Sequence, residues 1–331
     1  MTRMRRTAGV AALVLVVSGL SLRADADPDA LRFAGISGGA GIEVWDFWPK
    51  GGSCGSTQEA DADPHAVVAN GGWQASVMDA SGEVAGVPVG GHSTSTYRYS
   101  RDLRGTARID LRVASNAHLA PGPAEPCSII YEVGGAVMVH VTTRRRSWLV
   151  GRSADKVTGY RATNGGYVGL AVYDAANRRV ARADVGGRVT RLVPPDTYRS
   201  GLQLTVRLEL PAGDGSQLEG SLIGSGSISF IPVGTRRTLT GTGTDLITVG
   251  HRDCARNRVA AFFSSAARTR LRSATFVVDG QRRAVLRGRE LQHSSLVLDR
   301  IARRSAGKVS VRMVLRSGAR RVTASTSWPC A

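Results

Sequence analysis

The densest aromatic cluster of the sequence stands between two carboxylates. Glu43 and Asp46 flank Trp45, and Phe47 and Trp48 follow directly. Two carboxylates about 5–10 Å apart perform glycoside hydrolysis, and aromatic faces stack on sugar rings. These residues therefore indicate either a polysaccharide hydrolase or a glycan-binding platform. The alternative is that the rings are core residues of a first strand, because aromatic side chains dominate core energetics.

A second motif with catalytic spacing is Gly35–Gly39, which matches the G-x-S-x-G pattern of serine hydrolases around Ser37. That chemistry requires the serine on a strained turn from a strand into a helix. The segment Ile42–Trp48 that follows has the pattern of a strand, so we do not expect a nucleophile elbow.

Metal and general-base chemistry have little support in the sequence. Asp61, Asp63 and His65 alternate, but they lack the glycine and distal glutamate of a calcium loop, so we predict an acidic surface loop. The six histidines are scattered, and none is flanked by a recognisable partner. We predict neither a metal nor a cofactor.

Basic residues are concentrated at the C-terminus. The chain has a net charge of +18, and residues 246–331 hold 18 basic and 4 acidic residues, a net +14. Such a block attracts polyanions. The alternative is compositional, because arginine, alanine, glycine and valine are abundant throughout, and the arginines often alternate with apolar residues on solvated strand faces. The candidate binding arginines are the most densely placed ones: Arg282, Arg283, Arg287, Arg289, Arg303, Arg304, Arg320 and Arg321.

The N-terminus has the order of a secretory signal peptide. Arg3, Arg5 and Arg6 precede an apolar stretch from Ala8 to Leu22, and Ala24–Ala26 provides a cleavage motif. We predict that residues 1–26 are removed and that the mature protein is secreted or loosely associated with the cell surface. An uncleaved anchor is the alternative, although about 20 apolar residues are needed to span a membrane. No second apolar run predicts another span.

Four cysteines in an exported chain predict disulfides. Three pairings are possible, and we favour Cys54–Cys127 with Cys254–Cys330 because charge and composition change between the two pairs. No histidine lies at a zinc-ligand spacing from any of them.

Strand patterns dominate the mature chain. Apolar and polar residues alternate over Ala107–Val113 and over Val309–Leu315, which predicts half-buried strands. Asp279 and Gly280 separate two strand patterns, as in a type I′ hairpin. A similar turn is expected at 79–82, after a strand from Trp73 to Met78, and another at 174–177, after a strand at 167–173. Sustained helical periodicity is absent from the sequence, so we predict an all-β fold of tandem antiparallel sandwiches.

The expected organisation is a β-sandwich region at 27–233, either one large sandwich or two, a Gly-, Thr- and Arg-rich linker at 234–245, and a basic sandwich at 246–331. The last segment resembles the Ig-like domains that end many exported proteins of high-GC Gram-positive bacteria. The resemblance rests on Cys254, Cys330, the hairpins around Gly280 and Gly318, and the turn at 287–289. It implies a spacer or binding module without catalytic residues. Residues 167–205 resemble the jelly-roll modules of secreted bacterial hydrolases, in part through a corner at Pro195–Tyr198.

These observations favour a non-catalytic extracellular binding or structural protein. Its expected partner is an anionic polymer or a cell-wall glycan, without specific recognition of nucleic acid. The alternative is a secreted hydrolase of a polysaccharide or cell-wall polymer that uses Glu43 or Asp46.

Overall fold

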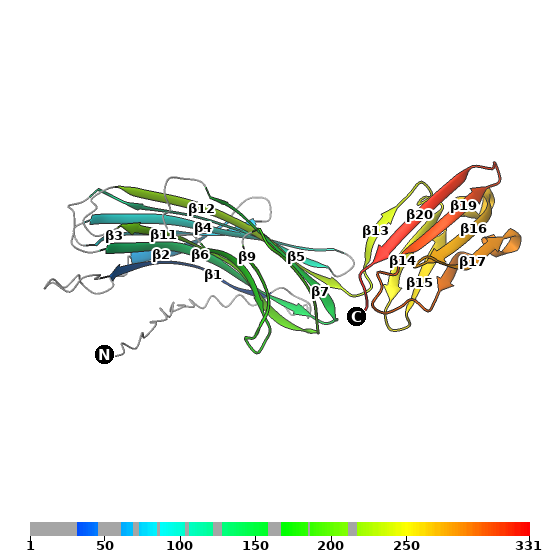
Figure 1. Ribbon diagram of the computed structural model, residues 1–331, viewed down its shortest axis with the longest axis horizontal. Helices are drawn as coiled ribbons and strands as arrows, with labels where there is room; N and C mark the ends of the chain where they lie inside the picture. The colour runs from blue at the N-terminus through cyan, green and yellow to red at the C-terminus, as the bar shows by residue number, and fades with distance from the viewer. Residues whose placement is uncertain are drawn as a thin grey trace, which may run out of the picture.

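The computed structural model describes residues 32–45, 61–68, 73–84, 87–102, 106–121, 128–157, 167–184, 186–210 and 217–331. They form two all-β bodies joined end to end (Figure 1). The predicted signal peptide lies outside the described residues. Among the described residues, no helix is long and apolar enough to cross a membrane.

The N-terminal sandwich consists of two antiparallel sheets. Sheet A has the strand order β1-β6-β11-β8-β9 and sheet B has the order β10-β7-β12-β5-β4-β3-β2. The strands of sheet A are β1 (Arg32–Trp45), β6 (Ser128–Thr143), β8 (Tyr167–Tyr173), β9 (Arg179–Asp184) and β11 (Asp196–Leu210). The strands of sheet B are β2 (Asp61–Val68), β3 (Trp73–Val84), β4 (Val87–Arg101), β5 (Ala107–Leu119), β7 (Ser147–Val157), β10 (Arg188–Val193) and β12 (Leu218–Pro232).

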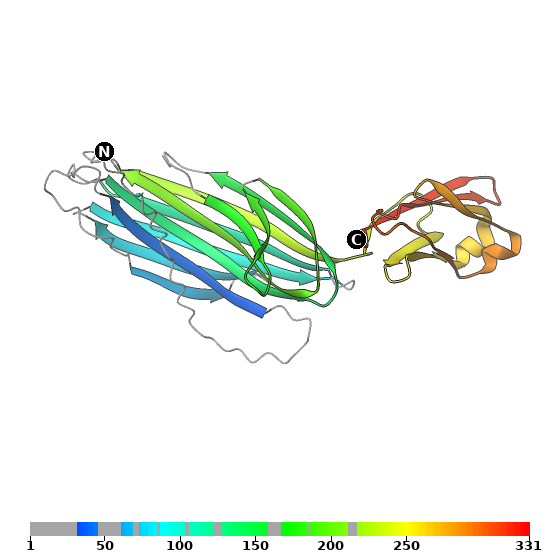
Figure 2. The same ribbon diagram turned by 60° about the horizontal axis from the view of Figure 1, so that its bottom comes forward.

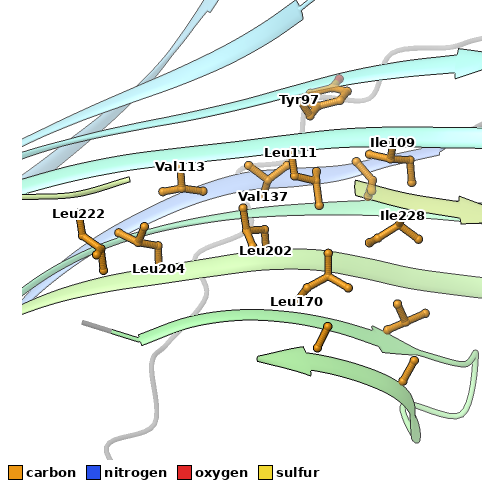
Figure 3. Close-up of a cluster of buried hydrophobic side chains, with 14 of the residues drawn as sticks. Tyr97, Ile109, Leu111, Val113, Val137, Leu170, Leu202, Leu204, Leu222 and Ile228 are labelled. Atoms are coloured by element: carbon orange, nitrogen blue, oxygen red, sulfur yellow. The ribbon is translucent and has the colours of Figure 1, made fainter. Parts of the chain in front are cut away.

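Sheets A and B enclose one hydrophobic core. Buried side chains from Met78 to Phe230 form a single cluster, and Figure 3 shows Leu111, Val137 and Leu202 meeting between the sheets. Strand β5 explains the packing, because its buried residues alternate with exposed or half-buried ones along its length. The described part of residues 27–233 is therefore one large sandwich, which the sequence left open.

A tyrosine corner fixes the start of β11. The Tyr198 hydroxyl donates to the Pro194 carbonyl at 2.6 Å, and its ring stacks on Phe230 with centroids 5.3 Å apart. Burial raises the pKa of Tyr198 to about 12, with smaller contributions from Asp196 and Asp174. The predicted corner at Pro195–Tyr198 is therefore a tyrosine corner, a hydrogen-bonded turn that also occurs in Greek-key sandwiches.

The C-terminal sandwich also has two antiparallel sheets. Sheet C has the order β13-β20-β19-β16-β17, and sheet D has the order β14-β15-β18. The strands of sheet C are β13 (Arg236–Thr240), β16 (Leu271–Val278), β17 (Gln281–Arg287), β19 (Val309–Leu315) and β20 (Arg320–Ser327). Sheet D comprises β14 (Ile247–Asp253), β15 (Arg258–Phe263) and β18 (Ser295–Leu298), and the connections include helix α1 (Ser265–Arg270) and the 3-10 helix η1 (Gly288–Gln292).

Several predicted features of this sandwich are confirmed. Strand β19 has the predicted bounds, and its inner residues are buried. Asp279 and Gly280 both have positive φ angles, 47° and 84°, as a type I′ turn requires. Cys254 and Cys330 form a disulfide with their Cα atoms 5.5 Å apart. Cys54 and Cys127 lie outside the described residues, so their pairing stays a prediction.

Two predicted boundaries were wrong. The turn expected at 79–82 is part of β3, which continues to Val84 and pairs with β4 throughout. The expected linker at 234–245 contains β13, which pairs with β20 at the edge of sheet C. Strand β13 is an edge strand with a neighbour, β20, on one side only. An edge strand often carries charged residues and buries little apolar surface, so this Thr- and Arg-rich segment forms a strand without an apolar run in its sequence.

The two sandwiches meet through a short junction without a free linker. The Trp148 Nε1–H of β7 donates to the Pro329 carbonyl at 2.8 Å, and its ring lies 5.8 Å from that of Trp328. The Arg237 guanidinium covers the Trp328 ring at 5.0 Å. The C-terminal tail therefore holds the N-terminal sandwich beside the disulfide of Cys330.

Candidate functional site

The predicted aromatic and carboxylate cluster is only partly described. Glu43 and Trp45 belong to the end of strand β1, where Trp45 pairs with Ser128 of β6. Asp46, Phe47 and Trp48 lie outside the described residues. Both the glycan platform and the carboxylate pair therefore stay predictions.

The other two motifs lie within strands. Ser37 pairs with Ala136 in the middle of β1, so the G-x-S-x-G pattern lies in a strand and not on a strand-to-helix elbow. Asp61, Asp63 and His65 belong to β2, which corrects the predicted loop. Among the described residues, no group of three or more histidine, cysteine or acidic side chains is arranged to hold a metal ion.

One hydrogen-bonded constellation was missed by sequence reasoning. On the outer face of sheet B, His92 Nδ1 lies 2.7 Å from Asp79 Oδ1, and His92 Nε2 lies 2.9 Å from Thr94 Oγ1. The His92 backbone N–H donates to Asn116 Oδ1 at 3.0 Å. Asp79 and His92 are paired across β3 and β4, a contact that the wrongly predicted turn at 79–82 concealed.

This row has the carboxylate, imidazole and hydroxyl order of an acyl-transfer triad. Its histidine and aspartate side chains are 42% and 65% exposed, however, so water screens their interaction. Acyl transfer also needs preorganised N–H donors aimed at the oxyanion, whereas β3 and β4 are each paired with strands on both sides. We interpret the row as a surface polar network.

The eight predicted arginines are all exposed, but they do not share one face. Arg282 and Arg287 lie on the outer face of sheet C together with Arg320, as the pairing of β17, β16, β19 and β20 shows. Arg321 pairs with the buried Met313, which directs it to the other side of the sheet. The remaining four are Arg283 at an irregularity in β17, Arg289 on η1, and Arg303 and Arg304 in the segment between β18 and β19.

The register of sheet C adds an arginine that the sequence did not single out. Arg312 pairs with Thr275 on one side and with Val322 on the other, so it occupies the middle of the outer face. Neighbouring strands lie about 4.8 Å apart and alternate residues about 7 Å apart. Arg312 therefore lies roughly 8 Å from Arg320 between their Cα atoms. Local sequence density is no guide to it, because its neighbours in β19 are apolar.

Sheet C carries no opposing charge. Its five strands, all of which the structure describes, contain nine arginines and no aspartate or glutamate. Arg282, Arg287, Arg312 and Arg320 form no ion pair with another described residue. Sheet D differs, because Asp253 there accepts from the Arg258 Nε–H at 3.2 Å and also lies near Arg256.

One arginine of the basic block is structural. Arg252 is 4% exposed, and its guanidinium donates to the carbonyls of Ile301 at 2.8 Å and of Ser305 at 3.0 Å. Burial lowers its pKa, which nearby Asp279 partly opposes. This residue organises the segment between β18 and β19 and is not available to a ligand.

Comparisons with known proteins do not assign the chain to a family. No protein-family model and no curated protein matches the chain. Among solved structures, it is similar to the crystal structure of a β-1,2-glucanase from Parabacteroides distasonis, with 11% identity and a TM-score of 0.18. The match covers 78% of this chain and 37% of that one, and a likeness at this level carries no functional argument.

Proposed function

We propose that the protein is an exported, non-catalytic binding protein whose C-terminal sandwich attaches it to an anionic polymer outside the cell. One observation carries this proposal. Four exposed arginines occupy the outer face of a sheet whose strands contain no carboxylate. Arginines on a shared face without counter-charges raise the local potential by several kT, whereas evenly scattered ones mainly aid solubility.

Two further features support the proposal. The N-terminal segment has the order of a signal peptide, and the disulfide of Cys254 and Cys330 suits an oxidising compartment. The C-terminal sandwich would act as an Ig-like binding module, and the larger sandwich would present a second surface. A cell-wall glycan held by Trp45, Phe47 and Trp48 is compatible with this arrangement.

The test is retention of the full mature chain on immobilised heparin and on immobilised polyphosphate across a salt series. Four phosphate contacts predict a slope of log K against log salt of about −3, because each contact contributes roughly −0.7 to −0.9. Failure to bind either polymer at low salt would overturn the proposal.

The hydrolase alternative has its own measurement. Turnover of wall polysaccharides by the wild-type chain that disappears in Glu43→Gln would replace a binding role with a catalytic one. We expect no such turnover.

A further inference from the structure

We propose that the primary contact with this polymer is made by the end of the C-terminal sandwich that lies farthest from the N-terminal sandwich, and that the polymer bears phosphate groups. This inference rests on the proposed function and deepens it. The site is a distal arginine cluster, defined as Arg270, Arg272, Arg287, Arg316, Arg320 and Arg321.

The topology of sheet C brings these residues together. Strand β16 begins and β19 ends at the same end of the sheet, because Leu271 pairs with Leu315. Arg272 follows the first of these residues and Arg316 follows the second. The Arg316 backbone N–H donates to the Arg270 carbonyl at 2.8 Å, which ties the two strand ends together.

The flanking strands complete the cluster. Arg287 is the last residue of β17 and Arg320 the first of β20, and both lie in the register row of Ser273 and Val314. Because β17, β16, β19 and β20 are consecutive neighbours, their ends are spaced about 5 Å apart. All six arginines of the cluster are exposed.

Opposing charge at this end is small. Glu290 lies in η1, and its Oε2 accepts the Arg287 backbone N–H at 3.0 Å. Asp245 lies in the turn between β13 and β14, a turn that is tied to Val322 by the Gly243 N–H. The other three acidic side chains of residues 246–331 are elsewhere. Asp253 pairs with Arg258, Asp279 accepts from Ser305 and Lys308, and Asp299 follows Leu298, the residue of β18 that pairs with Val259.

The cluster is free of the N-terminal sandwich. Strand β20 runs from Arg320 to Ser327 before the tail reaches the junction at Trp328. At about 3.3 Å per residue, the cluster lies roughly 25 Å from that junction. Figures 1 and 2 both show the β19–β20 hairpin pointing away from the larger sandwich. A long polymer can therefore pass over this end without meeting the rest of the protein.

The chemistry of the cluster selects the ligand. Arginines whose strands are about 5 Å apart attract a chain of high linear charge density, and a phosphate polymer is such a chain. Planar guanidinium forks also match phosphate oxygens in a bidentate manner. Phe262 is the exposed aromatic side chain of sheet D, and its ring lies across Gly250, where an added Cβ would be 2.9 Å from Cε2. Phe262 belongs to sheet D and not to the distal arginine cluster, so the six side chains that define the cluster are all guanidinium groups.

Matched variants of the full chain test the location. The distal variant is Arg272→Gln, Arg316→Gln and Arg320→Gln, and the control is Arg256→Gln, Arg283→Gln and Arg304→Gln, which removes the same charge from exposed positions outside the cluster. On polyphosphate, we expect the distal variant to flatten the salt slope by about 2 and to bind of order 100-fold more weakly at 0.1 M salt. We expect the control variant to stay near wild type, and both variants to unfold at the wild-type temperature.

Each other outcome has a defined meaning. If wild type binds neither heparin nor polyphosphate, the proposed function fails, whereas binding to heparin without binding to polyphosphate refutes only the phosphate class. If wild type binds and both variants weaken equally, bulk charge is responsible, and only the distal site is refuted. If wild type is retained on polyglutamate as strongly as on polyphosphate at the same salt concentration, the phosphate class is refuted. Stronger binding to vesicles of anionic phospholipid than to polyphosphate refutes a polymer in favour of a lipid surface.

Discussion

Removing the Cys254–Cys330 disulfide should destabilise the C-terminal sandwich without affecting its arginines. The two cysteines are 76 residues apart in the sequence. In the chain-entropy model, a loop of that length stabilises the folded state by about 4.5 kcal/mol at 25 °C. For a domain of fewer than 100 residues, this corresponds to a fall of roughly 20 °C in the unfolding temperature. The tail is also held by a backbone hydrogen bond beside the bridge, in which the Cys330 N–H donates to the Arg303 carbonyl at 2.9 Å.

The perturbation is the double variant Cys254→Ala and Cys330→Ala. Alanine avoids placing a hydroxyl at Cys330, which is only 5% exposed. The assay is differential scanning calorimetry of the full chain, in which two separate hydrophobic cores predict two resolvable transitions. Only the transition of the C-terminal sandwich should move. A shift of less than about 5 °C would refute the loop-entropy reasoning. Retention on polyphosphate below the new unfolding temperature should match wild type, because the bridge lies at the opposite end of the sandwich from the distal arginine cluster.

Two further predictions concern individual side chains. Hydrogen bonding from the Arg178 backbone lowers the pKa of Asp174, and the Arg178 guanidinium adds to this effect against the opposing effect of burial. A depressed pKa contributes stability above the unfolded value of about 3.9 that is lost as the pH falls through the folded value. Asp174→Asn should therefore lower the unfolding temperature at pH 7 but not at pH 2, and an equal loss at both would contradict this. Trp148→Phe keeps an aromatic contact with Trp328 but removes the N–H that donates to the Pro329 carbonyl. Small-angle scattering should therefore show a broader distribution of distances between the two sandwiches. An unchanged scattering profile would show that this hydrogen bond does not fix the junction.

Local patterns in the sequence predicted the fold where each strand buries one face. Strand β19 was predicted with its bounds because Val309, Val311, Met313 and Leu315 alternate with outward-facing residues. The Asp279–Gly280 turn was predicted because its positive φ angles suit these two residues. Strand β13 was missed because an edge strand needs few apolar residues.

The sites depended on register, which local patterns do not determine. Asp79 and His92 meet only because β3 runs past the polar segment that looked like a turn. Nothing in a single strand shows which residue of the next strand lies opposite. The short connection does show the pairing once the strand bounds are known. Strand β3 ends at Val84 and β4 begins at Val87, so the two strands form a tight hairpin that places Asp79 opposite His92.

The position of the charged site also depended on register. The sequence showed a net +14 over residues 246–331, but density along the chain selected Arg303 and Arg304 and passed over Arg312. Density along the chain is not density in space, because antiparallel pairing brings strand ends from distant segments together. Arg272, Arg316 and Arg320 are up to 48 residues apart in the sequence and stand at one end of three adjacent strands. A test that varies position at constant charge is therefore the one that separates a binding site from a basic composition.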